Sequence, residues 1–129
     1  MSLDKKVDRM ELGPHQMAWV EALESGEYKR GKLQLKNPDT GGYCCLGVAC
    51  EISKLGSWDT FGHYLDSKCY LPVKVLKWLG LRDECGSIYS YTPSRCNSLI
   101  EANDHKNFGF KKIAKMIREN PDNFFDKSV

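Results

Sequence analysis

The sequence predicts an α+β fold, a single domain in which four to five helices pack around a small antiparallel sheet. Apolar residues recur at spacings of three and four in several segments, which indicates amphipathic helices. Between the first two of these segments, a strictly alternating stretch and a turn rich in glycine and proline are typical of a β-hairpin at about 31–45. A chain of 129 residues suits one core rather than two, so we expect one domain over 1–129.

Helices are expected in five segments, the fourth of them short. The first covers about 14–25, because Pro14 suits the first turn of a helix and Gly26 suits a C-terminal cap. The apolar stripe that begins at Cys45 predicts a central helix that closes near Leu55, although Gly47 and the β-branched residues leave a longer strand as the alternative. The other three are expected from Leu71-Pro72 to Gly80, from Thr92-Pro93 through Ala102, and from Phe110 to Asn120-Pro121.

The expected hairpin has three parts. Residues 32–36 alternate between polar and apolar side chains, as a half-buried strand does. Residues 37–42 supply the turn, because proline presets φ and glycine accepts positive φ. Residues 43–45 form a short return strand.

Smaller elements and the two ends complete the prediction. One or two short strands are expected within 57–70 and another at 87–91. Residues 1–12 mix charges without a usable period, so we expect them to be flexible. The pair Phe124-Phe125 is too apolar for a free tail and is expected to dock on the body.

Composition and charge narrow the class of protein. The net charge is +2, so no overall field favours nucleic acid or a membrane surface. The N-terminus lacks the apolar core of a secretory signal, and no apolar run approaches the roughly 18–20 residues that span a bilayer. We therefore expect a soluble, cytoplasmic protein with no membrane partner. In that reducing compartment, the six cysteines are expected to be free thiols.

No metal and no cofactor is expected. Structural zinc sites favour paired ligands such as Cys-x2-Cys, because a short turn brings two sulfurs to one metal. The tandem pair Cys44-Cys45 does not do this, since adjacent side chains point in different directions in a strand or a helix. The remaining cysteines, which show no such pairing either, are Cys50, Cys69, Cys85 and Cys96.

Four blocks of the sequence resemble a small family of uncharacterised phage and prophage proteins. The blocks are Trp19 to Tyr28 with Gly31, Tyr43 to Cys50, Leu71-Pro72 with Trp78 to Leu81, and Leu99 to Ile117 with Asn103-Asp104 inside it. They span most of the chain in one order. The resemblance implies a phage or phage-derived origin and a single domain, and it carries no catalytic residues with it.

The tandem cysteines suggest one catalytic alternative. A thiol at a helix N-terminus can be activated by the helix dipole, and a cysteine-dependent hydrolase would pair Cys44 or Cys45 with a base. The candidate bases are His63 and His105. Against this, the pair lies in an apolar run, where burial raises the pKa of a thiol. Packing is the favoured interpretation, with Cys45 on the apolar stripe of the central helix and Cys44 pointing elsewhere.

Nucleic-acid binding is a second alternative. The last helix has a basic outer face, but solvated lysines are normal on an amphipathic helix and the overall charge is near neutral. This face consists of Lys106, Lys111, Lys112, Lys115 and Arg118.

The favoured function is that of a non-enzymatic accessory protein that binds a host protein or a small ligand. No catalytic cluster, phosphate loop or metal spacing stands out in the sequence. Asn103 and Asp104 are candidate contact residues beside two phenylalanines, although turn capping also explains them. Tyr89 and Tyr91 are further candidates, because tyrosine is common at interfaces.

Overall fold

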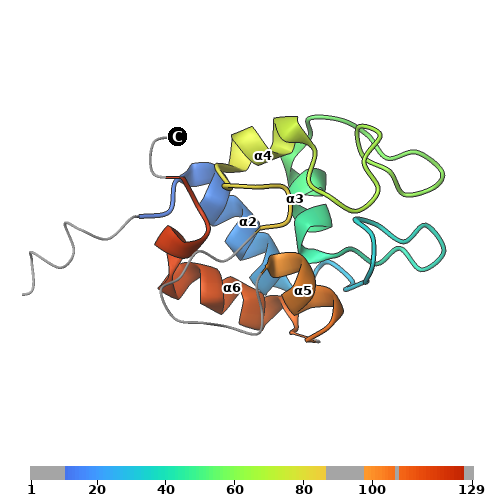
Figure 1. The fold of residues 1–129 in the computed structure, drawn as a ribbon. Helices are drawn as coiled ribbons and strands as arrows, with labels where there is room; N and C mark the ends of the chain where they lie inside the picture. The colour runs from blue at the N-terminus through green and yellow to red at the C-terminus, as the bar shows by residue number, and fades with distance from the viewer. Residues whose placement is uncertain (1–10, 87–97, 107, 127–129) are drawn as a thin grey trace, which may run out of the picture.

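The fold is all-helical in a computed structural model that describes residues 11–86, 98–106 and 108–126 (Figure 1). Within these residues no β-strand is present. The elements are α2 (Pro14–Ser25), α3 (Cys45–Ser53), α4 (Val73–Leu79), α5 (Leu99–Asp104), α6 (Phe110–Glu119) and a short 3-10 helix, η1 (Pro121–Asn123).

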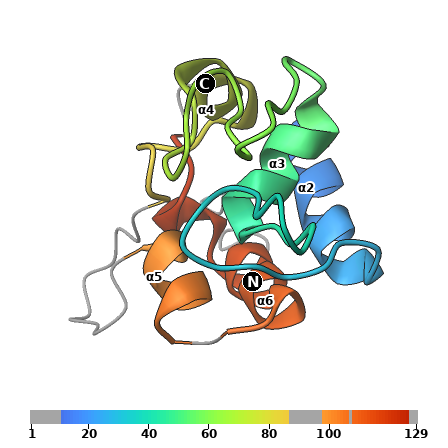
Figure 2. The same ribbon diagram turned by 90° about the vertical axis from the view of Figure 1, so that its right-hand side faces the viewer.

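Helix α2 lies at the centre and packs against α3, α4 and α6 (Figures 1 and 2). It buries Trp19, Val20 and Leu23 on one face, as the apolar spacing predicts. The Trp19 indole Nε1 donates a hydrogen bond to the Cys45 carbonyl at 2.9 Å. This bond gives the buried indole a partner and sets the start of α3 against α2.

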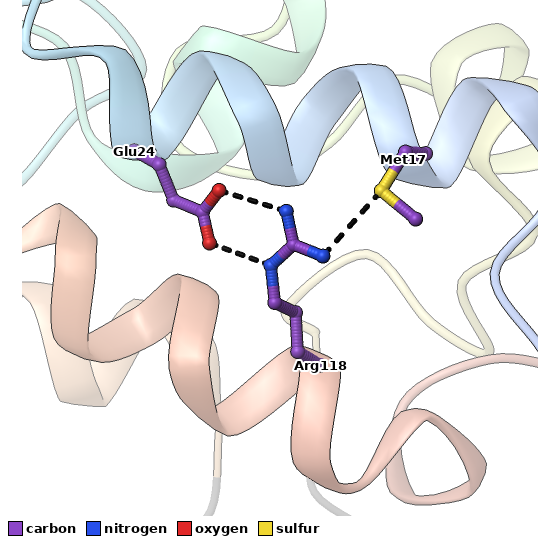
Figure 3. A network of polar contacts seen from close by, with 3 residues as sticks. All are labelled: Met17, Glu24 and Arg118. Carbon is purple, nitrogen blue, oxygen red and sulfur yellow. Dashed lines mark hydrogen bonds and ion pairs between the residues drawn. The ribbon is translucent and has the colours of Figure 1, made fainter.

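On the surface, Arg118 of α6 links that helix to α2 (Figure 3). Its Nε and Nη2 donate to the two carboxylate oxygens of Glu24 at 2.6 and 2.8 Å, and its Nη1 lies 3.6 Å from the Met17 sulfur. These hydrogen bonds from Arg118 lower the pKa of Glu24. Because both side chains of the ion pair are more than a third exposed, it contributes only about 0.2–1 kcal/mol.

The helix predictions that rest on local signals are confirmed. Helix α2 covers the predicted 14–25, and Gly26 caps it with a φ of 80°. Helix α6 runs from Phe110 to Glu119, as its apolar period predicts. Helix α3 ends at Ser53, two residues earlier than predicted, because Lys54 adopts a left-handed φ of 56°. The predicted helix start at Thr92-Pro93 lies outside the described residues.

The predicted sheet is wrong, and the hairpin at 31–45 shows why. Leu33 adopts a left-handed φ of 71°, which breaks any strand over 32–36. Leu33 is therefore 65% exposed while Leu35 is fully buried, although strict alternation would place both on one face. Residues 31–44, called the strap here, make only isolated bridges and lie across α3. The Leu35 carbonyl of the strap accepts a hydrogen bond from the Cys44 N–H at 3.1 Å.

The strands predicted within 57–70 are also absent. Within 57–70 the structure has isolated bridges from Tyr64 to Trp58 and to Ser67 and no strand. The predicted strand at 87–91 and most of the flexible segment 1–12 lie outside the described residues. Phe124 and Phe125 dock as predicted, at 1% and 0% exposed. No helix in the described part of the chain is long and apolar enough to cross a membrane.

Candidate functional site

The site is built by the two connections that flank α3, residues 26–44 and 54–72. Both project from the same end of the molecule (Figures 1 and 2). They touch where Gly62, with a φ of 83°, comes so close to the Lys36 carbonyl that a Cβ at position 62 would lie 2.1 Å from its oxygen. A second tie is the Leu35 N–H, which donates to the Lys68 carbonyl at 2.7 Å. These contacts bring side chains from the two connections together.

An aromatic cluster, defined here as Tyr28, Tyr43, Trp58 and Tyr64, joins them. The Tyr43 and Trp58 ring centroids are 5.8 Å apart, with 64° between the ring planes. Tyr28 packs edge-on against Tyr43 at 5.7 Å, and Tyr64 lies against Trp58 at 4.8 Å. Tyr64 is buried and the other three are half-buried, so the cluster runs from the core to the surface.

Glu51 of α3 holds the two central rings. Its Oε1 accepts hydrogen bonds from the Trp58 Nε1 at 2.8 Å and from the Tyr43 hydroxyl at 3.3 Å. Burial, together with the nearby Glu51 charge, raises the pKa of Tyr43 to about 12. The phenol is therefore protonated near neutral pH and donates to Glu51. A charge-assisted acceptor shared by two rings restrains their relative orientation.

The ammonium group of Lys36 lies over the same two rings. Its Nζ is 5.2 Å from the Tyr43 centroid and 5.4 Å from the Trp58 centroid. Both distances are within the roughly 6 Å at which an aromatic face attracts a cation. The half-buried Lys36 side chain thus reaches a position that suits positive charge.

A surface pocket of about 390 Å³ adjoins the cluster and shares Trp58 with it. Asp59 Oδ1 accepts backbone hydrogen bonds from His63 and Phe61, both at 2.9 Å, which lowers the pKa of its carboxyl. The His63 Nδ1 lies 3.4 Å from the other Asp59 oxygen. We call this the Trp58 pocket; its lining is Gly56, Ser57, Trp58, Asp59, His63, Leu65 and Asp66.

The tandem cysteines are buried, and the structure does not bring either to a histidine. Cys44 caps α3, its sulfur accepts a hydrogen bond from the Gly47 N–H at 3.4 Å, and burial raises its pKa to about 12. Burial likewise raises the pKa of Cys45, whose thiol donates to a backbone carbonyl. In the described part of the chain, His63 pairs with an aspartate and His105 lies exposed at the end of α5.

The cysteines that the structure describes form no disulfide. Burial raises the pKa of Cys50 as well, and it raises that of the partly exposed Cys85. Cys96 lies outside the described residues. Within the described ranges, no three histidine, cysteine or acidic side chains converge as a metal ion would need.

Asn103 lies inside the fold, and Asp104 beside it is half-buried. Asn103 is fully buried, and its Nδ2 donates to the Gly31 carbonyl and to Asp104 Oδ1, each at 2.8 Å. The Arg30 Nη1 donates to the Asn103 carbonyl at 2.7 Å. These bonds tie α5 to the connection between α2 and α3. Tyr89 and Tyr91 lie outside the described residues.

Part of the basic face on α6 is engaged within the protein. Arg118 is bonded to Glu24, and the Lys112 ammonium lies 3.9 Å from the Phe108 centroid. Lys111 is exposed on α6, and the exposed Lys106 lies before α6 begins, so it is not part of this helix face.

Sequence reasoning missed the aromatic cluster and its partners. The density of aromatic residues in 57–70 is a signal for such a cluster, but the same pattern is also typical of the short strands predicted there. Nothing in the local pattern links that segment to Lys36 or Glu51, which are 22 and 7 residues before Trp58.

One family comparison covers most of the chain. The domain of unknown function DUF8296 matches residues 15–121. This range includes the five α-helices of the described residues except the first residue of α2, and it includes the whole of the site described above. No curated protein and no solved structure matches the chain. We conclude that the chain belongs to the family defined by the domain of unknown function DUF8296.

Proposed function

We propose that this protein is a non-enzymatic accessory protein that binds a host protein or a small ligand through the Trp58 pocket and the apolar side chains beside it. We also propose a phage or prophage origin. The resemblance of the four sequence blocks to small phage and prophage proteins supports that origin.

The observation that carries the proposal is an exposed apolar surface at the pocket. Phe61 is 69% exposed, and its ring centroid lies 6.0 Å from that of His63, which lines the pocket. Leu65, which also lines the pocket, is 38% exposed. Large apolar side chains are costly to leave in water, and aromatic residues next to a pocket are frequent anchors of protein interfaces. Binding through such apolar side chains requires no catalytic residue.

The backbone at the pocket supports the same function. Leu65 and Asp66 are consecutive non-glycine residues with left-handed φ values of 49° and 68°. Each costs roughly 1–2 kcal/mol relative to a right-handed conformation. Strained residues of this kind persist where the surrounding structure holds them, and they cluster at binding sites.

The two alternatives have less support. A hydrolase with Cys44 or Cys45 as nucleophile needs a thiolate with access to substrate, but both thiols are buried with raised pKa values. Nucleic-acid binding through α6 needs an uncommitted basic face, but Arg118 and Lys112 already contact groups of the protein.

Affinity capture from host lysate tests the proposal. The bait is the tagged protein, and retained proteins and small molecules are identified by mass spectrometry. Phe61→Ser removes the exposed ring without opening the core. Val73→Ser is the matched control, because Val73 is 64% exposed but belongs to α4 and not to the connection 54–72 that builds the pocket.

We expect a partner that is retained by the unmodified protein and by Val73→Ser, and is lost with Phe61→Ser. If everything retained by the unmodified protein is retained equally by Phe61→Ser, the pocket surface is not the binding site. A retained hydrolase substrate together with turnover would support the cysteine alternative instead.

A further inference from the structure

We propose that Tyr43, Trp58 and Glu51 form a binding site for a quaternary ammonium group, which Lys36 of the same chain fills when no ligand is bound. This inference rests on the proposed binding function and names the chemistry of the ligand.

The two rings provide the walls of the site. Their planes make an angle of 64° with centroids 5.8 Å apart, so a cation that lies over the pair contacts both π-systems. The Lys36 ammonium lies at nearly equal distances from the two centroids, 5.2 and 5.4 Å. The chain's own side chain thus marks the position that a ligand cation would take.

Glu51 makes the site preorganised and negative. It accepts hydrogen bonds from both rings, so neither ring has to be reoriented when a cation binds. Tyr28 and Tyr64 support the outer sides of the pair through their ring contacts with Tyr43 and Trp58. The carboxylate adds a charge that favours cations over neutral groups of the same shape.

The ligand class follows from hydration. The primary ammonium of a lysine is compact and strongly hydrated, so it loses much of its hydration energy when it lies against aromatic rings. A trimethylammonium group is weakly hydrated and presents methyl groups to the rings, which is why aromatic cages recognise quaternary ammonium ligands. Lys36 has a long side chain and is half-buried, so it can leave for solvent when such a ligand arrives.

The Trp58 pocket offers room for the rest of the ligand. Trp58 belongs to both the pocket and the cluster, so the pocket is the neighbouring space into which the substituent of a bound cation would extend. Asp59 and Asp66 line the pocket and keep it negative. A trimethylammonium group can come from a choline-like small molecule or from a trimethyllysine side chain, and the site chemistry is common to both.

Titration with tetramethylammonium tests the site. Binding is monitored by NMR through the indole Nε1 resonances of the ¹⁵N-labelled protein. We expect the Trp58 resonance to shift, because its Nε1–H is bonded to Glu51 at the site. Lys36→Met keeps the aliphatic stem and removes the competing ammonium, so it is expected to tighten binding about fivefold. Trp78→Phe is the control: this half-buried tryptophan stacks on His15 and lies outside the cluster, so its replacement leaves binding unchanged.

The contribution of the ligand's positive charge is measured by comparing the affinity for choline with that for 3,3-dimethylbutan-1-ol, a neutral molecule of the same shape in which carbon replaces the nitrogen. Choline is expected to bind at least about fivefold more tightly. Equal binding of the two compounds would overturn the proposal, as would an affinity unchanged in Lys36→Met. Because Lys36→Met leaves the rings in place, these outcomes do not depend on a ring variant that fails to fold.

Two further arms identify the source of the ligand. Tighter binding of a trimethyllysine peptide than of choline indicates a modified protein, and the reverse indicates a small molecule. If tetramethylammonium fails to bind while affinity capture from lysate still depends on Phe61, the quaternary ammonium site is excluded and the proposed binding function stands. If it binds and capture is insensitive to Phe61, the site is retained and the Phe61 surface is excluded.

Discussion

At the scale of single residues, Cys44 shows two opposing effects on one thiol. It caps the N-terminus of α3, where the Gly47 N–H donates to its sulfur, and such a position lowers the pKa of a cysteine. Its side chain is also buried, and the cost of placing a thiolate there is larger, so its pKa rises to about 12. The net result is a small apolar core residue.

Alkylation with iodoacetamide, read by mass spectrometry of peptides, checks this balance. Between pH 7 and pH 9 we expect Cys44 and Cys45 to label at least about a hundredfold more slowly than free cysteine, whose thiolate fraction rises over that range as its pKa of about 8.5 is crossed. Cys69 is partly exposed and serves as the internal control, with faster labelling. Rapid labelling of Cys44 in the native protein would support a reactive thiol.

At the scale of elements, the strap over α3 depends on Gly47. A Cβ at this position would lie 1.9 Å from the Leu35 carbonyl oxygen, closer than any real contact. Glycine normally weakens a helix interior, but here it lets the strap approach the helix backbone. At Gly47, the apolar run 45–50 is therefore covered by an irregular segment rather than by a strand, and helices α2, α4 and α5 also pack against α3.

Gly47→Ala tests that packing. The change adds helix propensity worth about 1 kcal/mol, but the clash with backbone costs more, so we expect a net loss of about 2 kcal/mol in the free energy of unfolding. The measurement is chemical denaturation. Gly109→Ala at the N-cap of α6 is the control, since nothing lies near its added methyl group, and it is expected to cost under about 1 kcal/mol. A stabilised Gly47→Ala would mean that the strap does not lie on α3.

At the scale of the whole molecule, the C-terminal segment closes the core. Phe125 is fully buried and packs edge-on against Trp19 of α2 at 6.3 Å. The backbone beside it pairs with the end of α4, where the Asp126 N–H donates to the Gly80 carbonyl at 2.8 Å. Residues at the two ends of the described chain thus share one core.

Phe125→Ala is expected to lower the free energy of unfolding by about 3–5 kcal/mol, because it leaves a cavity at the centre of the fold. Thermal and denaturant unfolding measure this loss. Phe61→Ala is the matched control: the same side chain is removed from a position that is 69% exposed, and the cost is expected to stay within about 0.5 kcal/mol. Similar losses for both variants would contradict the docking of the C-terminal segment.

Local signals in the sequence were sufficient for the helices. Pro14 and Gly26 mark the two ends of α2, and the apolar period of 110–117 marks α6, because caps and periodicity act within a few residues. The alternation of 32–36 was misleading for a physical reason. The left-handed Leu33 interrupts the extended backbone, so Leu33 is exposed and only Leu35 is buried although the two alternate with polar residues.

The aromatic cluster could not be predicted in this way. Glu51 lies 8 residues after Tyr43 and 7 residues before Trp58, and the three side chains meet because one connection folds onto the other at Gly62. The energy of such a contact depends on the path of both connections, and neither path follows from local propensity. The amino-acid order alone thus specifies the helices and the burial of Cys45, whereas long-range packing places Lys36 over two rings and opens a pocket beside them.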